Sequence, residues 1–186
     1  MTLRDLPNLI SVLRIVLVIP IVYLLVQRQF GLALVLFAVA GISDGLDGYL
    51  AKRYNWSSRL GSILDPLADK LLLVSAFLAL AWVGEIPLWL VIAIMARDVI
   101  IILGGIIYHY LIGQFEMVPT WISKLNTVFQ IVLVLAIVFS LGVYTLSPAM
   151  INGLVIMVTI TTLISGLDYI WVWGRRATLA SKQERS

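Results

Sequence analysis

The sequence predicts an all-α integral membrane protein with six transmembrane helices and a short amino-terminal interfacial helix. Apolar residues make up 61% of the 186 positions, and the mean hydropathy is +1.04. Charged residues make up 12%, against roughly 25% in soluble domains. Several apolar runs reach the ~20 residues that a helix needs to cross a bilayer. We expect residues 1–186 to form a single membrane domain embedded in the lipid bilayer.

Short polar turns divide the chain into its expected elements. Arg4, Asp5 and Pro7 lie in a polar lead, residues 1–7, that predicts the interfacial helix. Pro87 is placed to begin a helix. The tail from Arg175 to Ser186 is polar, and we expect it to be frayed. The six expected spans are residues 8–27, 31–54, 60–83, 87–108, 121–141 and 149–173.

The basic residues predict the orientation of these spans. Arg97 lies inside a span. Arg28 is the one basic residue expected on the side of the membrane opposite to the others. The positive-inside rule places the group of remaining basic residues, both termini and the candidate active site in the cytoplasm. Because the basic residues flank membrane segments, the net charge of +3 does not indicate a nucleic-acid partner. That group is Arg4, Arg14, Lys52, Arg53, Arg59, Lys70, Lys124, Arg175, Arg176, Lys182 and Arg185.

Four of the ten acidic residues lie in one short stretch between apolar runs: Asp44, Asp47, Asp65 and Asp69. Spacings of three and four residues place each pair on one face of its helix. Because a short turn joins the two helices, we expect them to be antiparallel neighbours whose four carboxylates converge. Acidic residues in membrane helices are costly, so the cluster predicts a functional site.

The chemistry of the cluster favours a divalent metal. The chain has no cysteine and a single histidine, so the ligands would be oxygens, which select Mg²⁺, Mn²⁺ or Ca²⁺. Four carboxylates can hold two ions ~4 Å apart, an arrangement suited to phosphoryl displacement. Gly45, Gly48 and Gly61 would leave clearance for a bulky diphosphate.

Three basic residues lie near the acidic cluster, and two alternative interpretations of the cluster stay open. Lys52, Arg53 and Arg59 lie at the same membrane edge and could contact phosphate. A bundle with a water-filled acidic vestibule is one alternative. A site that transports divalent cations is another, although no pair of broken helices is evident.

The spacing of the cluster resembles the signature of the CDP-alcohol phosphatidyltransferase family. Lys52 stands where that family usually has arginine, which keeps the charge but loses the bidentate fork. The family pattern is Asp, two residues, Asp-Gly, two residues, Ala-Arg, eight residues, Gly, three residues, Asp, three residues, Asp. The matching positions are Asp44, Asp47, Gly48, Ala51, Gly61, Asp65 and Asp69.

The resemblance implies a transfer of a phosphatidyl group from CDP-diacylglycerol to an alcohol, with release of CMP. It implies that Asp44, Asp47 and Asp65 bind Mg²⁺ or Mn²⁺, with two ions expected, and that Asp69 binds metal and acts as base. It also implies a homodimer. The residues expected to contact the CDP-lipid are Gly48, Ala51, Lys52, Arg59 and Gly61.

Two subgroups of the family are similar to this chain, and they differ in acceptor. One uses glycerol 3-phosphate and makes phosphatidylglycerophosphate, and the other uses phosphatidylglycerol and makes cardiolipin. Two segments resemble the cardiolipin synthases: residues 119–127 with Gln130, and Ala96–Val99 followed by Gly104–Gly105. Asn126 stands where the other subgroup has a second lysine, which fits an acceptor of lower charge.

Arg97 and Lys124 are the expected ligands of the acceptor phosphate. The alternative for Arg97 is a buried ion pair with Asp98 or Asp168. Asp98 is expected to be the weaker partner, because adjacent residues do not face each other on a helix. Asp168 itself is expected to be a cap or an ion-pair partner.

Overall fold

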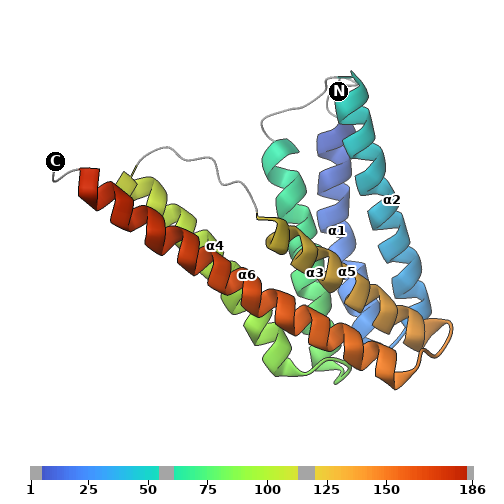
Figure 1. Ribbon diagram of the computed structural model, residues 1–186. Helices are drawn as coiled ribbons and strands as arrows, with labels where there is room; N and C mark the ends of the chain where they lie inside the picture. Colours follow the sequence, from blue (N-terminus) through green and yellow to red (C-terminus); the bar gives the residue numbers. More distant parts are fainter. Residues whose placement is uncertain (1–5, 55–60, 113–119, 184–186) are drawn as a thin grey trace. The chain divides into compact units, whose positions relative to one another are not determined.

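The computed structural model describes residues 6–54, 61–112 and 120–183 (Figure 1). Within these helices it describes no side chains at residues 6–9, 47–52, 61–63, 105–112 and 170–183. All regular secondary structure in the described ranges is helical, which confirms the all-α class. The helices are α1 (Leu6–Val26), α2 (Phe30–Tyr54), α3 (Gly61–Trp82), α4 (Leu88–Ile112), α5 (Trp121–Gly142) and α6 (Pro148–Gln183).

The expected boundaries hold closely for α2, α3 and α5, and the differences lie at two helix ends. α4 continues to Ile112 and α6 to Gln183, beyond the expected ends at residues 108 and 173. The end of α6 is rich in Ala, Leu, Arg, Lys and Gln, which favour helix without being apolar. Hydropathy therefore indicated where the apolar run stops, not where the helix stops. Most of the expected interfacial helix, residues 1–5, lies outside the described residues.

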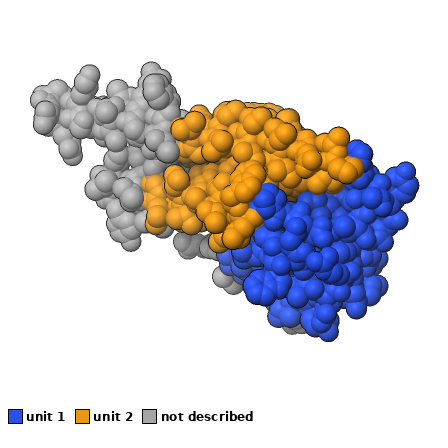
Figure 2. Space-filling model, turned by 90° about the horizontal axis from the view of Figure 1, so that it is seen from below, with its two compact units in different colours: residues 1–87, 134–147 blue, residues 88–133, 148–186 orange. Residues whose placement is uncertain are grey.

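The chain divides into two compact units, coloured separately in Figure 2. Unit 1 consists of residues 1–87 and 134–147, and unit 2 of residues 88–133 and 148–186. α5 contributes its first half to unit 2 and its second half to unit 1. α4 and α6 pack against each other in unit 2.

In unit 1, α1 packs against both α2 and α3 and lies between them (Figure 1). The prediction that the two acidic helices are direct neighbours is therefore wrong for the described residues. Alanines are fully buried on α2 (Ala33, Ala40) and on α3 (Ala68, Ala76). Such small residues allow helix backbones to approach closely. The short turn limits the distance between the acidic helices but leaves room for a third helix between them.

Two turns meet at one end of unit 1. Arg28 and Gly84 have positive φ values of 57° and 85°, and each ends its helix with the hydrogen-bond pair of a Schellman motif. Arg28 Nη2 donates to the carbonyl of Val83 at 2.8 Å, and Nη1 lies 3.4 Å from Glu85. The predicted topology also places these two turns on the same side of the membrane.

Large apolar side chains cover outward faces of the helices. On α2 the exposed set is spaced by three or four residues: Leu32, Val35, Val39, Ile42 and Leu46. By length and composition, two helices of the described residues could cross a membrane, Trp121–Gly142 and Pro148–Tyr169. Ile10–Val26 and Phe30–Leu46 are shorter apolar helical stretches. The number of six spans therefore stays a prediction.

Candidate active site

A buried arginine of α1 joins the two acidic helices of unit 1. The Arg14 side chain is 1% exposed, and its Nη2 lies 2.7 Å from Oδ1 of Asp44. Its Nη1 lies 2.5 Å from Oδ1 of Asp69. Asp44 and Asp69 are 48% and 55% exposed. One guanidinium therefore brings together two predicted metal ligands that are 25 residues apart in the sequence.

Asp65 is held by the same helix. Ser11 donates a hydrogen bond from Oγ to Oδ1 of Asp65. Ser11 and Arg14 are three residues apart, so they lie on one face of α1, and both are buried. The sequence analysis placed Arg14 inside a span but missed its role as a partner of the cluster. A serine and an arginine at helical spacing in an apolar segment could have predicted this contact.

The described part of the cluster has the donor chemistry that Mg²⁺ and Mn²⁺ prefer. Asp44 and Asp69 are hard oxygen ligands, and each is half exposed with one oxygen bonded to Arg14. No group of three metal-binding side chains occurs among the side chains that the structure describes, and Asp47 is not one of them. The convergence of all four carboxylates therefore stays a prediction. The residues present fit a divalent ion by chemistry and by exposure.

The expected contacts of the CDP-lipid lie outside the described side chains. This holds for Gly48, Ala51, Lys52 and Gly61, and Arg59 falls in the undescribed turn. Gly45 is described, and a methyl group there would meet no atom within 4 Å. The space beside Asp44 is thus open, as the clearance hypothesis requires.

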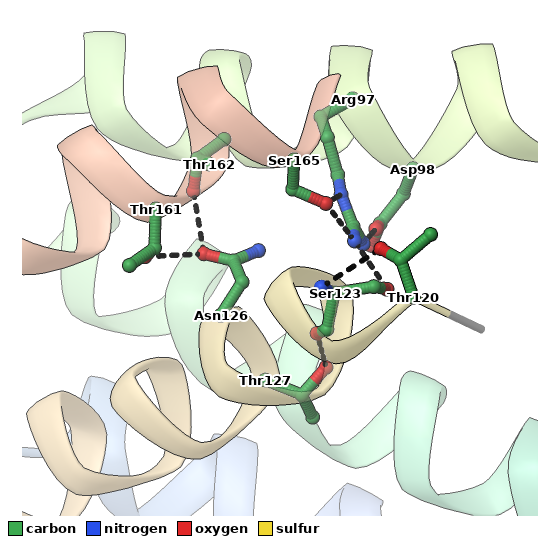
Figure 3. Close-up of polar contacts among 9 residues, drawn as sticks. All are labelled: Arg97, Asp98, Thr120, Ser123, Asn126, Thr127, Thr161, Thr162 and Ser165. Carbon is green, nitrogen blue, oxygen red and sulfur yellow. Dashed lines mark hydrogen bonds and ion pairs between the residues drawn. The ribbon is translucent and has the colours of Figure 1, made fainter. Parts of the chain in front are cut away.

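A second buried guanidinium organises unit 2 (Figure 3). Arg97 of α4 donates from Nε and Nη2 to Oγ of Ser165 on α6, at 3.1 and 2.6 Å. Nη2 also donates to Oγ of Ser123 on α5 at 2.5 Å. The guanidinium carbon lies 6.0 Å from the ring centre of Tyr169. Arg97 therefore connects three helices through one side chain.

Arg97 forms its ion pair with Asp98, at 2.7 Å between Nη1 and Oδ1. The expectation that Asp98 is the weaker partner is wrong. Although adjacent residues point to different sides of a helix, the long arginine side chain can turn back toward its neighbour. Both residues are buried, so the pairing removes the cost of an isolated charge in an apolar surrounding.

The start of α5 carries the second predicted acceptor ligand. Thr120 precedes the helix, and its Oγ1 accepts a hydrogen bond from the backbone N–H of Ser123 at 3.3 Å, the geometry of an N-cap. Lys124 is exposed on the next position. No partner of its ammonium occurs among the described residues, whereas each nitrogen of the Arg97 guanidinium already donates a hydrogen bond. Of the two predicted acceptor ligands, Lys124 is the accessible one.

Asn126 extends the polar network along α5. Its Oδ1 accepts hydrogen bonds from Oγ1 of Thr161 and Oγ1 of Thr162, each at 2.9 Å. Figure 3 shows these contacts beside the Arg97 cluster. A membrane helix of this composition would gain specificity of packing from such buried hydrogen bonds.

The family model of the CDP-alcohol phosphatidyltransferases matches residues 4–165, a range that covers parts of both units. The chain belongs to the CDP-alcohol phosphatidyltransferase family. The contacts of Asp44, Asp65 and Asp69 therefore lie within the range that the family model matches.

The chain is similar to relatives with two different printed activities. It is 38% identical over 146 residues to the human "Cardiolipin synthase (CMP-forming)", covering 70% of this chain and 48% of that protein. It is 34% identical over 190 residues to a "Probable cardiolipin synthase (CMP-forming)" of Drosophila melanogaster, covering 90% of this chain and 57% of that protein. The chain thus spans about half the length of these two relatives.

A bacterial relative is matched over nearly its whole length. It is the "CDP-diacylglycerol--glycerol-3-phosphate 3-phosphatidyltransferase" of Aquifex aeolicus, 34% identical over 170 residues. The alignment covers 89% of this chain and 93% of that protein. The relatives therefore agree on the family and differ in the activity that their names state.

Proposed function

We propose that this protein transfers a phosphatidyl group from CDP-diacylglycerol to an alcohol and releases CMP, as a step of phospholipid biosynthesis. The observation that carries the proposal is the meeting of Asp44 and Asp69 on one buried guanidinium, inside the family signature. The match spans parts of both units, which supports a single catalytic domain over residues 1–186.

In this proposal, Asp44, Asp47, Asp65 and Asp69 hold Mg²⁺ or Mn²⁺, with two ions as the working number. A bound divalent ion neutralises the charge of the diphosphate and of the transferring phosphoryl group. Arg14 holds Oδ1 of Asp44 and of Asp69 in place and competes with the metal for their negative charge. Ser11 orients Asp65 through its hydrogen bond.

Asp69 is the proposed general base. It takes the proton of the acceptor hydroxyl, whose oxygen then bonds to the phosphorus that bears the diacylglycerol. The bond from this phosphorus to the oxygen of CMP breaks, and CMP leaves. The half-exposed position of Asp69 allows a hydroxyl to approach, while the contact with Arg14 restricts the rotation of the carboxylate.

We infer that phosphatidylglycerol is the preferred acceptor, so that the product is cardiolipin. The names of the human and Drosophila relatives and Asn126 in place of a second cation support this choice. Glycerol 3-phosphate is the second candidate, because the relative from Aquifex aeolicus is covered almost fully. An acceptor competition with both compounds, CDP-diacylglycerol and Mn²⁺, followed by mass spectrometry of the lipids, decides between them.

The substitution Asp69→Asn tests the chemistry. We expect CMP release to fall by at least about 100-fold, the lower range for general acid–base catalysis, while the protein still folds. CMP release at the wild-type rate would show that Asp69 is not the base. Flux of Mn²⁺ through proteoliposomes without nucleotide would instead support the transport alternative.

The proposal includes a bilayer and a homodimer. Outward-facing apolar side chains on α2 and two helices long and apolar enough to cross a bilayer support insertion in a membrane. The proposed site lies on the cytoplasmic side of a bacterial inner membrane. Mass photometry in nanodiscs would measure the number of protomers, and a particle with one chain would refute the dimer.

A further inference from the structure

Two buried amide groups of α5 have hydrogen-bond donors without a partner among the described residues. Asn126 is 0% exposed and Gln130 is 2% exposed. Nδ2 of Asn126 and Nε2 of Gln130 donate no hydrogen bond there. Leaving a buried polar group unpaired costs ~1–3 kcal/mol, and unpaired groups are rare in folded proteins. Two of them one helical turn apart therefore require an explanation.

The hydroxyl of Thr162 contacts the oxygen end of the Asn126 amide. It donates to Oδ1 of Asn126 at 2.9 Å, which leaves the amide nitrogen as the unpaired end. Thr161 donates to the same oxygen at 2.9 Å and also lies 2.8 Å from the carbonyl of Met157. Threonine contacts thus account for the oxygen of Asn126 but not for its two N–H groups.

Asn126 and Gln130 continue a polar face that begins at Ser123. The spacings of three and four residues place the three side chains on one face of α5. The face extends ~10 Å along the helix, at 1.5 Å per residue. Arg97 at its beginning is neutralised by Asp98. The deeper part of this face consequently offers uncharged donors, which bind oxygen acceptors of low charge.

We propose that Asn126 and Gln130 form a subsite for the glycerophosphate headgroup of the acceptor. Their amide N–H groups donate to hydroxyl and phosphate oxygens of that headgroup. The subsite rests on the proposed function, which requires an alcohol acceptor. Uncharged donors favour a phosphodiester over a phosphomonoester, so phosphatidylglycerol binds here in preference to glycerol 3-phosphate. Lys124, exposed at the start of the same helix, supplies a cation at the entrance.

The substitution Gln130→Met tests the subsite, because it keeps the length of the side chain and removes both donors. Leu133→Met is the matched control, since Leu133 is buried on the same helix and has no polar atom. We expect Gln130→Met to raise KM for phosphatidylglycerol by about tenfold, the loss of roughly one hydrogen bond to a charged group. Gln130→Met should leave the KM for CDP-diacylglycerol unchanged. Its melting temperature should equal that of the wild-type protein or be higher. Leu133→Met should leave both KM values unchanged.

A binding measurement keeps the subsite testable without turnover. The melting temperature of solubilised protein is titrated with phosphatidylglycerol in one series and with glycerol 3-phosphate in another. Gln130→Met should move the midpoint of the phosphatidylglycerol titration about tenfold higher.

The two hypotheses fail in different ways. If the wild-type protein binds phosphatidylglycerol but releases no CMP from CDP-diacylglycerol, the proposed function fails and the subsite stands. If Gln130→Met lowers the melting temperature and leaves the titration midpoint unchanged, the amide has a structural partner, and the subsite is refuted. An absence of any shift with either compound in the wild-type protein also refutes it.

Discussion

Arg14 shows at the scale of one residue how a charge is kept inside unit 1. It is almost fully buried and bridges two half-exposed carboxylates. A buried arginine without partners would be expensive, and so would two neighbouring carboxylates without a cation. Each partner therefore stabilises the other. In the proposed function, a divalent metal would neutralise the same carboxylates as Arg14, so the contacts of Arg14 would oppose metal binding.

The substitution Arg14→Met should destabilise the metal-free protein. We expect a loss below the roughly 3–5 kcal/mol typical of a fully buried ion pair, because the two carboxylates left behind are half exposed. Added Mn²⁺ should then raise the melting temperature of Arg14→Met more than that of the wild-type protein. Differential scanning fluorimetry with and without EDTA measures both effects. Arg53→Met, at an exposed position, is the control, and equal responses of the two variants to Mn²⁺ would contradict the coupling.

Gly45 lies beside Asp44 and provides a second test at this scale. A methyl group at Gly45 or at Gly41 would meet no atom within 4 Å. Alanine should therefore stabilise the helix by ~1 kcal/mol at either position. If the space at Gly45 admits the diphosphate, Gly45→Ala should also lower CMP release, while Gly41→Ala should not. Melting temperature and initial rates separate the two effects, and full activity of Gly45→Ala would mean that the space is not used.

At the scale of elements, the ends of α2 and α5 are in unusually close contact. A methyl group at Gly142 would lie 2.6 Å from the backbone nitrogen of Gly31 and 2.7 Å from the carbonyl carbon of Phe30. The obstacle is backbone rather than a flexible side chain, so the helices would have to move apart. Glycine is required here because the two backbones approach too closely for any side chain.

The substitution Gly142→Ala should thus destabilise unit 1 by about 1–3 kcal/mol, the range for overpacking. Gly153→Ala is the matched control, because a methyl group at Gly153 meets no atom within 4 Å. The free energy of unfolding in mild detergent, from denaturant titration, compares them. A stabilised Gly142→Ala would show that the contact opens without cost.

Elements differ in how well the sequence predicted them. The bounds of α2, α3 and α5 follow from apolar runs between polar turns, because those turns break the helix where the apolar run ends. The end of α6 does not follow, since residues after the apolar run keep a high helix propensity. The length of the loop could not predict that α1 lies between α2 and α3. A short loop limits the distance between the two helices that it joins, but it does not require them to be in contact.

At the scale of the whole molecule, the predicted orientation in the membrane can be tested with introduced cysteines. The chain contains no cysteine, so single cysteines can be introduced without background labelling. Gln29→Cys and Tyr144→Cys lie in turns expected outside the cytoplasm, and Arg53→Cys lies at the expected cytoplasmic end. All three positions are exposed.

A maleimide that does not cross membranes should label Gln29→Cys and Tyr144→Cys in intact cells. Arg53→Cys should be labelled only after the membrane is permeabilised, as the positive-inside rule requires. A gel-shift assay in both conditions gives the answer. Labelling of Arg53→Cys in intact cells would reverse the orientation, and labelling of only one outer turn would change the number of spans.

The sequence by itself determined the helical class and the family, and it predicts the chemistry of the acidic stretch, because these depend on composition and on spacing within single helices. Hydrophobic runs and the i, i+3 and i, i+4 pairs are local properties, so no packing is needed to recognise them. The tertiary structure decided which distant side chains meet. It placed Arg14 between Asp44 and Asp69, turned Arg97 toward Asp98, Ser123 and Ser165, and buried two amides of α5 whose nitrogens have no partner among the described residues. These contacts join residues on different helices or depend on side-chain rotation, and helix packing sets both.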